Sequence, residues 1–461
     1  MSENENPSPA GGPDPSSPTP AAAIVKLPLL ESPVGVGDRI ESIDVLRGVA
    51  VLGILMINIE FFALPMMSFF NPAIMGGFSG INLWVWKFSN VFFLQKMMAI
   101  FSMLFGAGLI LMYQRADASG RSFGKVYYRR LLWLGLIGLA HAYFFWYGDI
   151  LFTYAVCGLL LFPLRRRSPQ ALIILSVVFI VFGALIILGS GASFAFMKSE
   201  AAKAQTALDA GETATVQQTM LKQQWEQIET MFKGSPEQIA AETSAYQNGF
   251  LAALKYRAPQ SLMMQTQAMI FQAIWRTLGL MLLGMALLKL GILSGGRSLR
   301  FYVILAFIGF GIGLPLTAYG AEASIAHGFD VVQNFTADSH FNYFGSILVS
   351  LAYISIVMII SKRNLVRGLQ HRLAAVGRTA FSNYLLQTLI CTTIFYGYGL
   401  GLFGRLERIY LLGVVLAVWI FQLYISPIWL RRYRLGPAEW LWRSLTYRRR
   451  QPFRVTPSTS S

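Results

Sequence analysis

A histidine and an aspartate at the two ends of one aromatic run are the residues best suited to chemistry in this chain of 461 residues. His141 and Asp149 flank the stretch HAYFFWYGD, in which Gly148 permits a tight turn. We expect the two side chains to come within hydrogen-bonding reach across that turn. A histidine beside a carboxylate in a partly dry site is a general base with its orienting partner. The alternative is that both residues cap helix ends near the lipid headgroups.

Two further polar side chains, Asn58 and Glu60, lie near the far end of an apolar stretch that runs from Ile43 to Leu64. An amide at such a position is suited to orienting a substrate or stabilising a developing oxyanion. We therefore predict a catalytic role for Asn58 and substrate binding for Glu60. The simpler interpretation is hydrogen bonding between helices, which is common for asparagine in a membrane bundle.

The same stretch opens with Asp44 and Arg47, three residues apart on one helical face. Charged groups cost roughly 2.5–3.5 kcal/mol each near the centre of a bilayer on insertion scales, so we expect these two to face protein or the interface. They can form a local ion pair or, with other arginines, bind an anionic cofactor. The alternative is that they anchor the helix end at the membrane surface.

A second polar pattern begins at Arg378, and Asn383 and Gln387 follow it on one helical face. A polar stripe this dense in a membrane helix has to face the interior of the protein. The pattern predicts a cavity with Asn383 and Gln387 in contact with substrate. Arg378 is a second candidate for binding an anionic cofactor.

The composition indicates a multi-pass membrane protein. The chain is 55% hydrophobic and only 13% charged, whereas a soluble domain carries about 25% charged residues. The net charge of +16 comes from basic clusters between apolar stretches, a distribution that favours cytoplasmic loops and anionic lipid over nucleic acid. Two cysteines in apolar runs make no metal or disulfide motif. The His327, Asp330, Asp338 and His340 spacing matches no standard metal site, so no metal is expected.

Apolar stretches of about 20 residues can cross the hydrocarbon core of a bilayer, which is about 30 Å thick. Ten candidates occur, at residues 43–64, 84–113, 131–147, 150–164, 171–197, 266–290, 301–320, 341–360, 379–402 and 409–430. We therefore predict an all-α, polytopic membrane helix bundle of about ten transmembrane helices.

The basic residues also predict the orientation and the domains. Placing the basic loops and the tail after residue 431 inside satisfies the positive-inside bias, so both termini are expected to be cytoplasmic. The predicted segments are a disordered tail, an N-terminal membrane half, an extracytoplasmic amphipathic helical segment, a C-terminal membrane half and a basic cytoplasmic tail. Their bounds are 1–38, 39–197, 198–259, 260–430 and 431–461.

Several motifs resemble those of the YeiB-like family, domain of unknown function 418. They are DVLRGVAVLGILMIN (44–58), KMMAIFSMLFGAG (96–108), LIGLAHAYFFWYGDILFTYA (136–155), VGRTAFSNYLLQT (376–388) and GPAEWLWRSLTY (436–447). The resemblance implies a multi-pass protein of the bacterial plasma (inner) membrane, and a role in transport has been suggested for this family.

The first of these motifs is also similar to the opening of integral-membrane acyltransferases, including heparan-α-glucosaminide N-acetyltransferases. Asp44, Arg47 and Gly48 match their D-x-x-R-G pattern, and Asn58 stands where the heparan-type enzymes also carry asparagine. This resemblance implies acyl-CoA (acetyl-CoA) in the cytosol as donor and an envelope glycan or lipid as acceptor. Those enzymes have a histidine in the following loop. Residues 59–82 contain none, which leaves His141 as the candidate.

The leading hypothesis is therefore a membrane acyltransferase in which His141, oriented by Asp149, is the base toward a hydroxyl or amine. Arg47 and Arg378 would bind the donor. The competing hypothesis is a transporter or permease for a small solute or lipid, which needs only the inward polar stripe and the intramembrane charges. A third is a membrane scaffold that binds a partner through residues 198–259.

Overall fold

The structure is a computed structural model that describes residues 40–118 and 123–455. The predicted tail at 1–38 lies outside the described residues. The described chain consists of helices and connecting turns, and its single isolated β-bridge joins Tyr433 to Arg454. The prediction of an all-α polytopic bundle is confirmed.

The described residues before 210 form α1 to α7 and one 3₁₀ turn, η2. The helices are α1 (Glu41–Ala63), α2 (Met67–Phe70), α3 (Gly80–Phe92), α4 (Lys96–Ala118), α5 (Gly124–Phe144), α6 (Leu151–Leu161), η2 (Phe162–Arg166) and α7 (Pro169–Asp209).

The described residues after 210 form α8 to α18 and two π-helical segments, η3 and η4. The elements are α8 (Val216–Lys233), α9 (Pro236–Gln247), α10 (Phe250–Met263), η3 (Met264–Ala273), α11 (Ile274–Lys289), α12 (Leu299–Ala326), α13 (Val331–Gln333), η4 (Asn334–Asp338), α14 (Ser339–Lys362), α15 (Arg367–Arg378), α16 (Ala380–Phe395), α17 (Arg408–Arg432) and α18 (Pro437–Tyr447).

Seven helical stretches of the described chain are long and apolar enough to cross a membrane. They are Glu41–Ala63, Gly80–Ala118, Pro169–Asp209, Phe250–Lys289, Leu299–Ala326, Val331–Lys362 and Arg408–Arg432. The other three predicted spans lie in α5, in α6 with η2, and in α16. Helix α5 opens with several basic residues, and α6 and α16 have only 11 and 16 residues. The count of ten stays a prediction.

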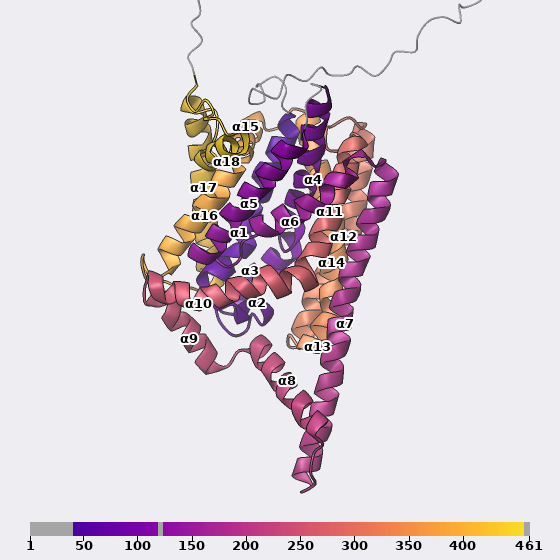
Figure 1. Ribbon diagram of the computed structural model, residues 1–461, viewed down its shortest axis with the longest axis vertical. Helices are drawn as coiled ribbons and strands as arrows, with labels where there is room; N and C mark the ends of the chain where they lie inside the picture. Colours follow the sequence, from indigo (N-terminus) through magenta and orange to yellow (C-terminus); the bar gives the residue numbers. More distant parts are fainter. Residues whose placement is uncertain (1–39, 119–122, 456–461) are drawn as a thin grey trace, which may run out of the picture.

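The predicted extramembrane segment is helical and extends from the bundle on the long helix α7. This helix continues without a break past the predicted boundary at residue 197 to Asp209, and α8 packs back against it (Figure 1). Capping boxes at Thr215 and Ser235 satisfy the free N–H groups where α8 and α9 begin. On α8, the buried Trp225 packs in a small apolar cluster with Val331 and Phe335.

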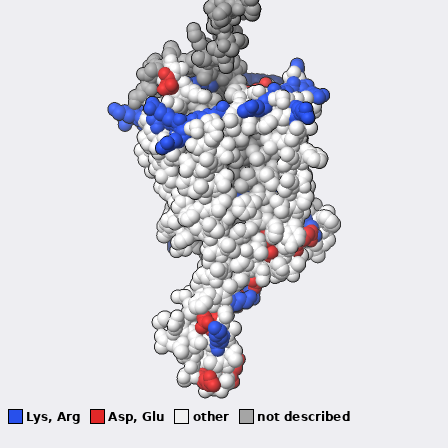
Figure 2. Space-filling model, turned by 90° about the vertical axis from the view of Figure 1, so that its right-hand side faces the viewer, with Lys and Arg blue, Asp and Glu red and all other residues white. Residues whose placement is uncertain are grey.

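Both ends of the described chain lie at the same end of the bundle. The start of α1 packs against α15, and α15 and α18 lie at the upper end in Figure 1. Figure 2 shows a band of Lys and Arg side chains around this end, which we call the basic end. Its cytoplasmic orientation follows from the positive-inside bias and stays a prediction.

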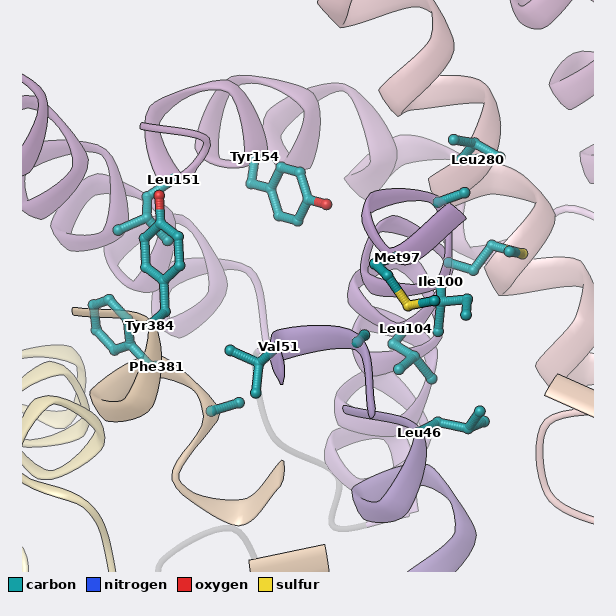
Figure 3. Packing of buried hydrophobic residues seen from close by; sticks show 14 of the residues in the cluster. Leu46, Val51, Met97, Ile100, Leu104, Leu151, Tyr154, Leu280, Phe381 and Tyr384 are labelled. Carbon is teal, nitrogen blue, oxygen red and sulfur yellow. The ribbon is translucent and has the colours of Figure 1, made fainter. Parts of the chain in front are cut away.

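Helix α1 lies inside the bundle and packs against α4, α15, α16 and α17. Figure 3 shows its Leu46 and Val51 within the core, near Leu104 of α4 and Phe381 of α16. Helices α4 and α11 cross closely at glycines: a Cβ on Gly106 would lie 1.9 Å from the Met281 carbonyl oxygen. Glycines at such crossings let two membrane helices approach closely, where packing holds them together.

Candidate functional site

Three side chains from three helical regions form a hydrogen-bonded relay. His141 Nδ1 lies 2.9 Å from Asp149 Oδ1, and His141 Nε2 lies 2.9 Å from Thr388 Oγ1. His141 is 4% exposed, and the Asp149 side chain is fully buried. The structure thus brings together the two residues predicted to pair across the turn, and it adds a hydroxyl from α16.

The turn between α5 and α6 fixes the position of the aspartate. Asp149 Oδ2 accepts a hydrogen bond of 3.0 Å from the Phe152 N–H, so the carboxylate caps the first turn of α6. A Cβ on Gly138 would lie 2.6 Å from the Phe152 nitrogen and 2.9 Å from Asp149 Oδ2. Glycine at position 138 therefore lets the start of α6 lie directly against α5.

This arrangement is that of an orienting acid, a base and a hydroxyl. When Nδ1–H of His141 donates to Asp149, Nε2 is free to accept the proton of the Thr388 hydroxyl. The same order of groups activates a serine or threonine in enzymes of acyl transfer. Thr388 was not among the predicted site residues, because nothing local distinguishes it from the other hydroxyl residues of its helix.

Aromatic rings enclose the imidazole. The ring centroids of Tyr384 and Trp146 lie 5.3 and 6.3 Å from that of His141, and Phe62 of α1 stacks on Trp146 at 4.2 Å. Such a shell excludes water and strengthens the polar contacts inside it. The imidazole is therefore shielded from bulk solvent.

Asn58 is not part of the relay. It is half-buried on α1, and within the described chain its amide has no hydrogen-bonding partner. Asn58, His141 and Asp149 line neither of the two cavities described below. The catalytic role predicted for Asn58 stays a prediction.

Glu60 is held by a buried arginine. Its Oε1 lies 3.1 Å from Nε of Arg408, which also donates to the carbonyls of Pro72, Met75 and Gly77. The arginine thereby ties the loop after α2 to the far end of α1. Glu60 also lines a cavity of about 200 Å³.

We call this cavity the outer chamber. It lies between α1, α3, α12 and η4, in the half of the bundle away from the basic end (Figure 1). Amides, hydroxyls, two carboxylates and several aromatic rings line it. Apart from Glu60, none of its lining residues was predicted from the sequence, because they come from loops and helices far apart along the chain.

Asn383 and Gln387 face the interior, as predicted, but neither lines a described cavity. The Asn383 amide donates to Ser426 Oγ at 3.0 Å, and the Gln387 amide donates to Val51 O at 3.1 Å and Gln422 Oε1 at 2.9 Å. These bonds connect α16 to α17 and α1. The geometry gives both residues the role of holding helices together.

At the basic end, Arg47 pairs with Asp44 at 2.8 Å, which is one of the arrangements that their three-residue spacing allowed. Arginines from other helices lie within electrostatic range: Arg130 of α5 interacts with Arg47 and Arg443, and Arg443 of α18 interacts with Arg47 and Arg115. We call Arg47, Arg115, Arg130 and Arg443 the arginine cluster.

The electrostatics of the cluster favour a bound anion. Burial lowers the pKa of the Arg443 guanidinium, and the charges of Arg47 and Arg115 lower it further against the opposing effects of Tyr447 and Glu439. Glu439 is already occupied, since it accepts from the Phe381 N–H at 2.8 Å and from Ser382. Arginines that repel one another in this way bind phosphate or carboxylate groups readily.

Arg378 lies beside this region, at the end of α15. The preceding Gly377 packs on the backbone of Asp44, whose carbonyl oxygen would lie 1.8 Å from an added Cβ. Arg378 is half-buried, and its Nε has no hydrogen-bonding partner in the described part of the chain. The two predicted donor-binding arginines are thus carried by helices that cross at their ends.

A second basic feature at this end is an open groove of about 1250 Å³ between α5 and α18. Lys125, Arg129 and the three arginines at 448–450 line it, together with Trp133 and Trp440. Basic and aromatic side chains together are typical of the headgroup region of a membrane. In the described residues, no group of three or more His, Cys, Asp or Glu side chains is arranged to hold a metal ion.

Comparison with known proteins gives one family and several full-length relatives. A family model described as "Protein of unknown function (DUF418)" matches residues 287–449. "Uncharacterized protein YeiB" of Escherichia coli (strain K12) is 33% identical over 432 residues, which are 90% of this chain and 98% of that protein. "Uncharacterized protein YxaH" of Bacillus subtilis (strain 168) is 31% identical over 431 residues, 91% of this chain and 97% of that protein. No solved structure matches.

Proposed function

The chain belongs to the DUF418, or YeiB-like, family of proteins, and we propose that this multi-pass helical membrane protein is an acyltransferase of the bacterial inner membrane. It takes an acyl group from acyl-CoA, with acetyl-CoA the simplest donor, at the basic end. It delivers that group to a hydroxyl or amine of an envelope glycan or lipid.

The relay of Asp149, His141 and Thr388 is the observation that carries this proposal. Both imidazole nitrogens lie 2.9 Å from their partners, which sets the ring in one orientation. Asp149 holds the proton on Nδ1, so that Nε2 acts as the base. A relay that only pinned three helices together would need no ionisable ring, since an amide would form the same two bonds.

The arginine cluster supports the donor side of the reaction. The phosphates of CoA are anionic, and arginine forks bind such groups in a bidentate way. Arg130 and His141 lie on the same helix, α5, eleven residues apart, which corresponds to about 16 Å along its axis. An extended CoA arm can cover such a distance, so one donor can contact the cluster while its thioester approaches His141.

Two measurements test the proposal. Purified full-length protein should bind acetyl-CoA, and Arg47→Ala should weaken that binding at least fivefold, because the cluster loses one positive charge and the ion pair between Arg47 and Asp44 is removed. In cells, His141→Ala should abolish acyl labelling of the envelope at unchanged expression. His371→Ala, at an exposed histidine on α15, is the matched control. Full labelling in His141→Ala would reject the assignment.

The outer chamber favours a second candidate, transport of a small solute. Helices α3 and α4 form one span that is interrupted at Gln95, whose φ is 66°. Transporters build their substrate sites from interrupted helices of this kind. Solute uptake into proteoliposomes without any acyl donor would favour transport over acyl transfer.

A further inference from the structure

The outer chamber is lined by a buried side-chain amide whose oxygen has a hydrogen-bonding partner in the protein and whose nitrogen has none in the described chain. Asn342 of α14 is 7% exposed and lines the chamber. Its Oδ1 accepts a hydrogen bond of 2.6 Å from Lys96 Nζ, and lysine can only donate, so the orientation of the amide is settled. Its Nδ2 has no hydrogen-bonding partner in the described part of the chain. Leaving a buried donor unpaired is unfavourable, so a ligand or water in the chamber has to satisfy it.

An unpaired acceptor lines the same chamber. The Oε1 atom of Gln95 is buried without a hydrogen-bonding partner among the described residues. The wall therefore presents one free donor, at Asn342, and one free acceptor, at Gln95. A hydroxyl group both donates and accepts, whereas a carboxylate or phosphate oxygen at neutral pH mainly accepts.

The charges of the wall also disfavour an anion. Glu60 and Asp338 line the chamber, and no Lys or Arg is among its lining residues. Lys96 is fully buried behind the Asn342 amide, and its Nζ donates to that amide and to the Asn90 carbonyl at 2.9 Å. Glu60 is paired with Arg408, and Asp338 is paired with His327, so an anionic ligand would meet paired carboxylates and no free cation among the lining residues. A neutral hydroxyl group can still donate a hydrogen bond to these carboxylates.

Aromatic rings form the apolar part of the wall. Trp86 packs edge-to-face on Phe329 at 5.7 Å, and Phe69 and Phe70 from the short helix α2 also line the chamber. Aromatic faces give a solute apolar contact while leaving its polar groups free to bond at the amides. A site that combines rings, amides and carboxylates suits a solute with an apolar ring face and several hydroxyl groups.

We infer that the outer chamber binds a neutral, polyhydroxylated solute of the size of one sugar ring, through Asn342, Gln95 and Glu60 with aromatic contacts. The volume of about 200 Å³ equals the liquid volume of about seven water molecules, which fits one monosaccharide unit and not two. This inference goes beyond acyl transfer and does not depend on it, because it rests on the lining of the chamber alone.

Binding is tested on the full chain in phosphatidylcholine nanodiscs prepared without any sugar-based detergent. The probes are glucose and N-acetylglucosamine as neutral rings, maltose as a disaccharide, and sodium acetate and inorganic phosphate as anions, each titrated calorimetrically without acyl-CoA. A neutral monosaccharide should bind, and maltose and the two anions should bind at least tenfold more weakly. Methyl glucoside, compared with glucose, separates a free sugar from one linked through its anomeric carbon.

Two variants link binding to the chamber. Asn342→Leu should weaken monosaccharide binding at least tenfold. Ser324→Phe should do the same by filling the chamber, since the Ser324 hydroxyl makes only a bond to Gly320 O within its own helix. The control is Ser190→Phe on α7, where the hydroxyl makes the equivalent bond to Ile186 O and the residue is not among those that line the chamber.

The outcomes divide cleanly. Monosaccharide binding that Ser190→Phe retains and Ser324→Phe loses supports the inference, even if Asn342→Leu fails to fold. Binding of acetate or phosphate in preference to the sugars overturns it, and so does the absence of any saccharide binding, which would leave a chamber filled with water only. Full acyl labelling in His141→Ala, which would reject the acyltransferase assignment, has no bearing on these titrations, so the two proposals fail separately.

Discussion

The relay adjoins α1 through Trp146, which stacks on Phe62, and Ile57 and Glu60 of the same helix line the outer chamber. The two sites differ in whether their polar groups have protein partners. In the relay, both ring nitrogens of His141 and both carboxylate oxygens of Asp149 have protein partners. In the chamber, Asn342 and Gln95 each keep a buried atom without a partner in the described chain. Polar groups whose hydrogen bonds are all made within the protein indicate a rigid, pre-organised centre. Buried polar groups without partners beside an open volume indicate a place where a ligand can bind.

The largest effect should come from breaking the relay. Asp149→Ala leaves the His141 Nδ1–H and the Phe152 N–H buried without partners, so we expect a loss of about 3–5 kcal/mol in the free energy of unfolding. Thermal unfolding in detergent, followed by intrinsic fluorescence, measures this loss. Asp209→Ala, at the exposed end of α7, is the control. An unchanged melting temperature in Asp149→Ala would show that the relay is not saturated as described.

A second large effect concerns Glu242 of α9, which accepts a hydrogen bond from the Met66 N–H at 3.2 Å and so connects α9 to the chain after α1. Burial raises the pKa of this carboxyl from 4.5 to about 7, against the lowering effect of the hydrogen bonds from Met66 and Gln260. The folded state therefore binds the proton more tightly than the unfolded state. The contribution of Glu242 to stability is complete below pH 4.5 and is lost as the pH rises through 7.

This pH dependence has a simple test. The loss should be on the order of 3 kcal/mol between pH 4.5 and pH 7.5, and Glu242→Gln, which carries no titrating proton, should remove that part of the slope. Melting temperatures of both proteins across this pH range, measured in one detergent, give the comparison. Parallel pH profiles for the two would contradict the assignment to Glu242.

A smaller effect separates the role of Thr388 in the reaction from its role in folding. Thr388→Val keeps the shape but leaves His141 Nε2 without its partner, at a cost of about 1 kcal/mol in stability. If the hydroxyl takes part in acyl transfer, envelope labelling should fall at least a hundredfold. Thr388→Ser should restore most of it. Labelling that falls only with the amount of folded protein would limit Thr388 to positioning the ring.

The smallest effect is expected behind the chamber wall. In the described chain no carboxylate pairs with Lys96, so Lys96→Met removes a buried cation while leaving the Asn342 and Asn90 oxygens unpaired. Removing the buried charge stabilises the fold, and leaving the two oxygens unpaired destabilises it. The free energy of unfolding should therefore change by no more than about 1 kcal/mol. Lys87→Met, on the same span and paired with Glu322 at 2.6 Å, is the matched control. A loss as large as that of Asp149→Ala would mean that the chamber wall is as saturated as the relay.

The candidate site was predictable only where its parts are close in sequence. His141 and Asp149 are eight residues apart, and Asp44 and Arg47 are three apart, so a turn and a helical repeat place each pair together. Thr388 is 247 residues from His141, and no local pattern marks it. The inward orientation of Asn383 and Gln387 followed from their shared helical face, but the same pattern cannot tell a cavity wall from a contact between helices.

The sequence by itself determined the helical, multi-pass architecture, the basic end and these short-range pairs, because hydropathy, charge and helical periodicity are properties of neighbouring residues. Only the tertiary structure decided which polar groups are satisfied and which face open space. The arginine cluster draws on four helices, and the outer chamber exists only because α1, α3, α12 and η4 pack around it. Whether a polar group finds a hydrogen-bonding partner depends on which atoms packing brings together. The packing of helices that are distant in sequence cannot be predicted from any single stretch of the chain.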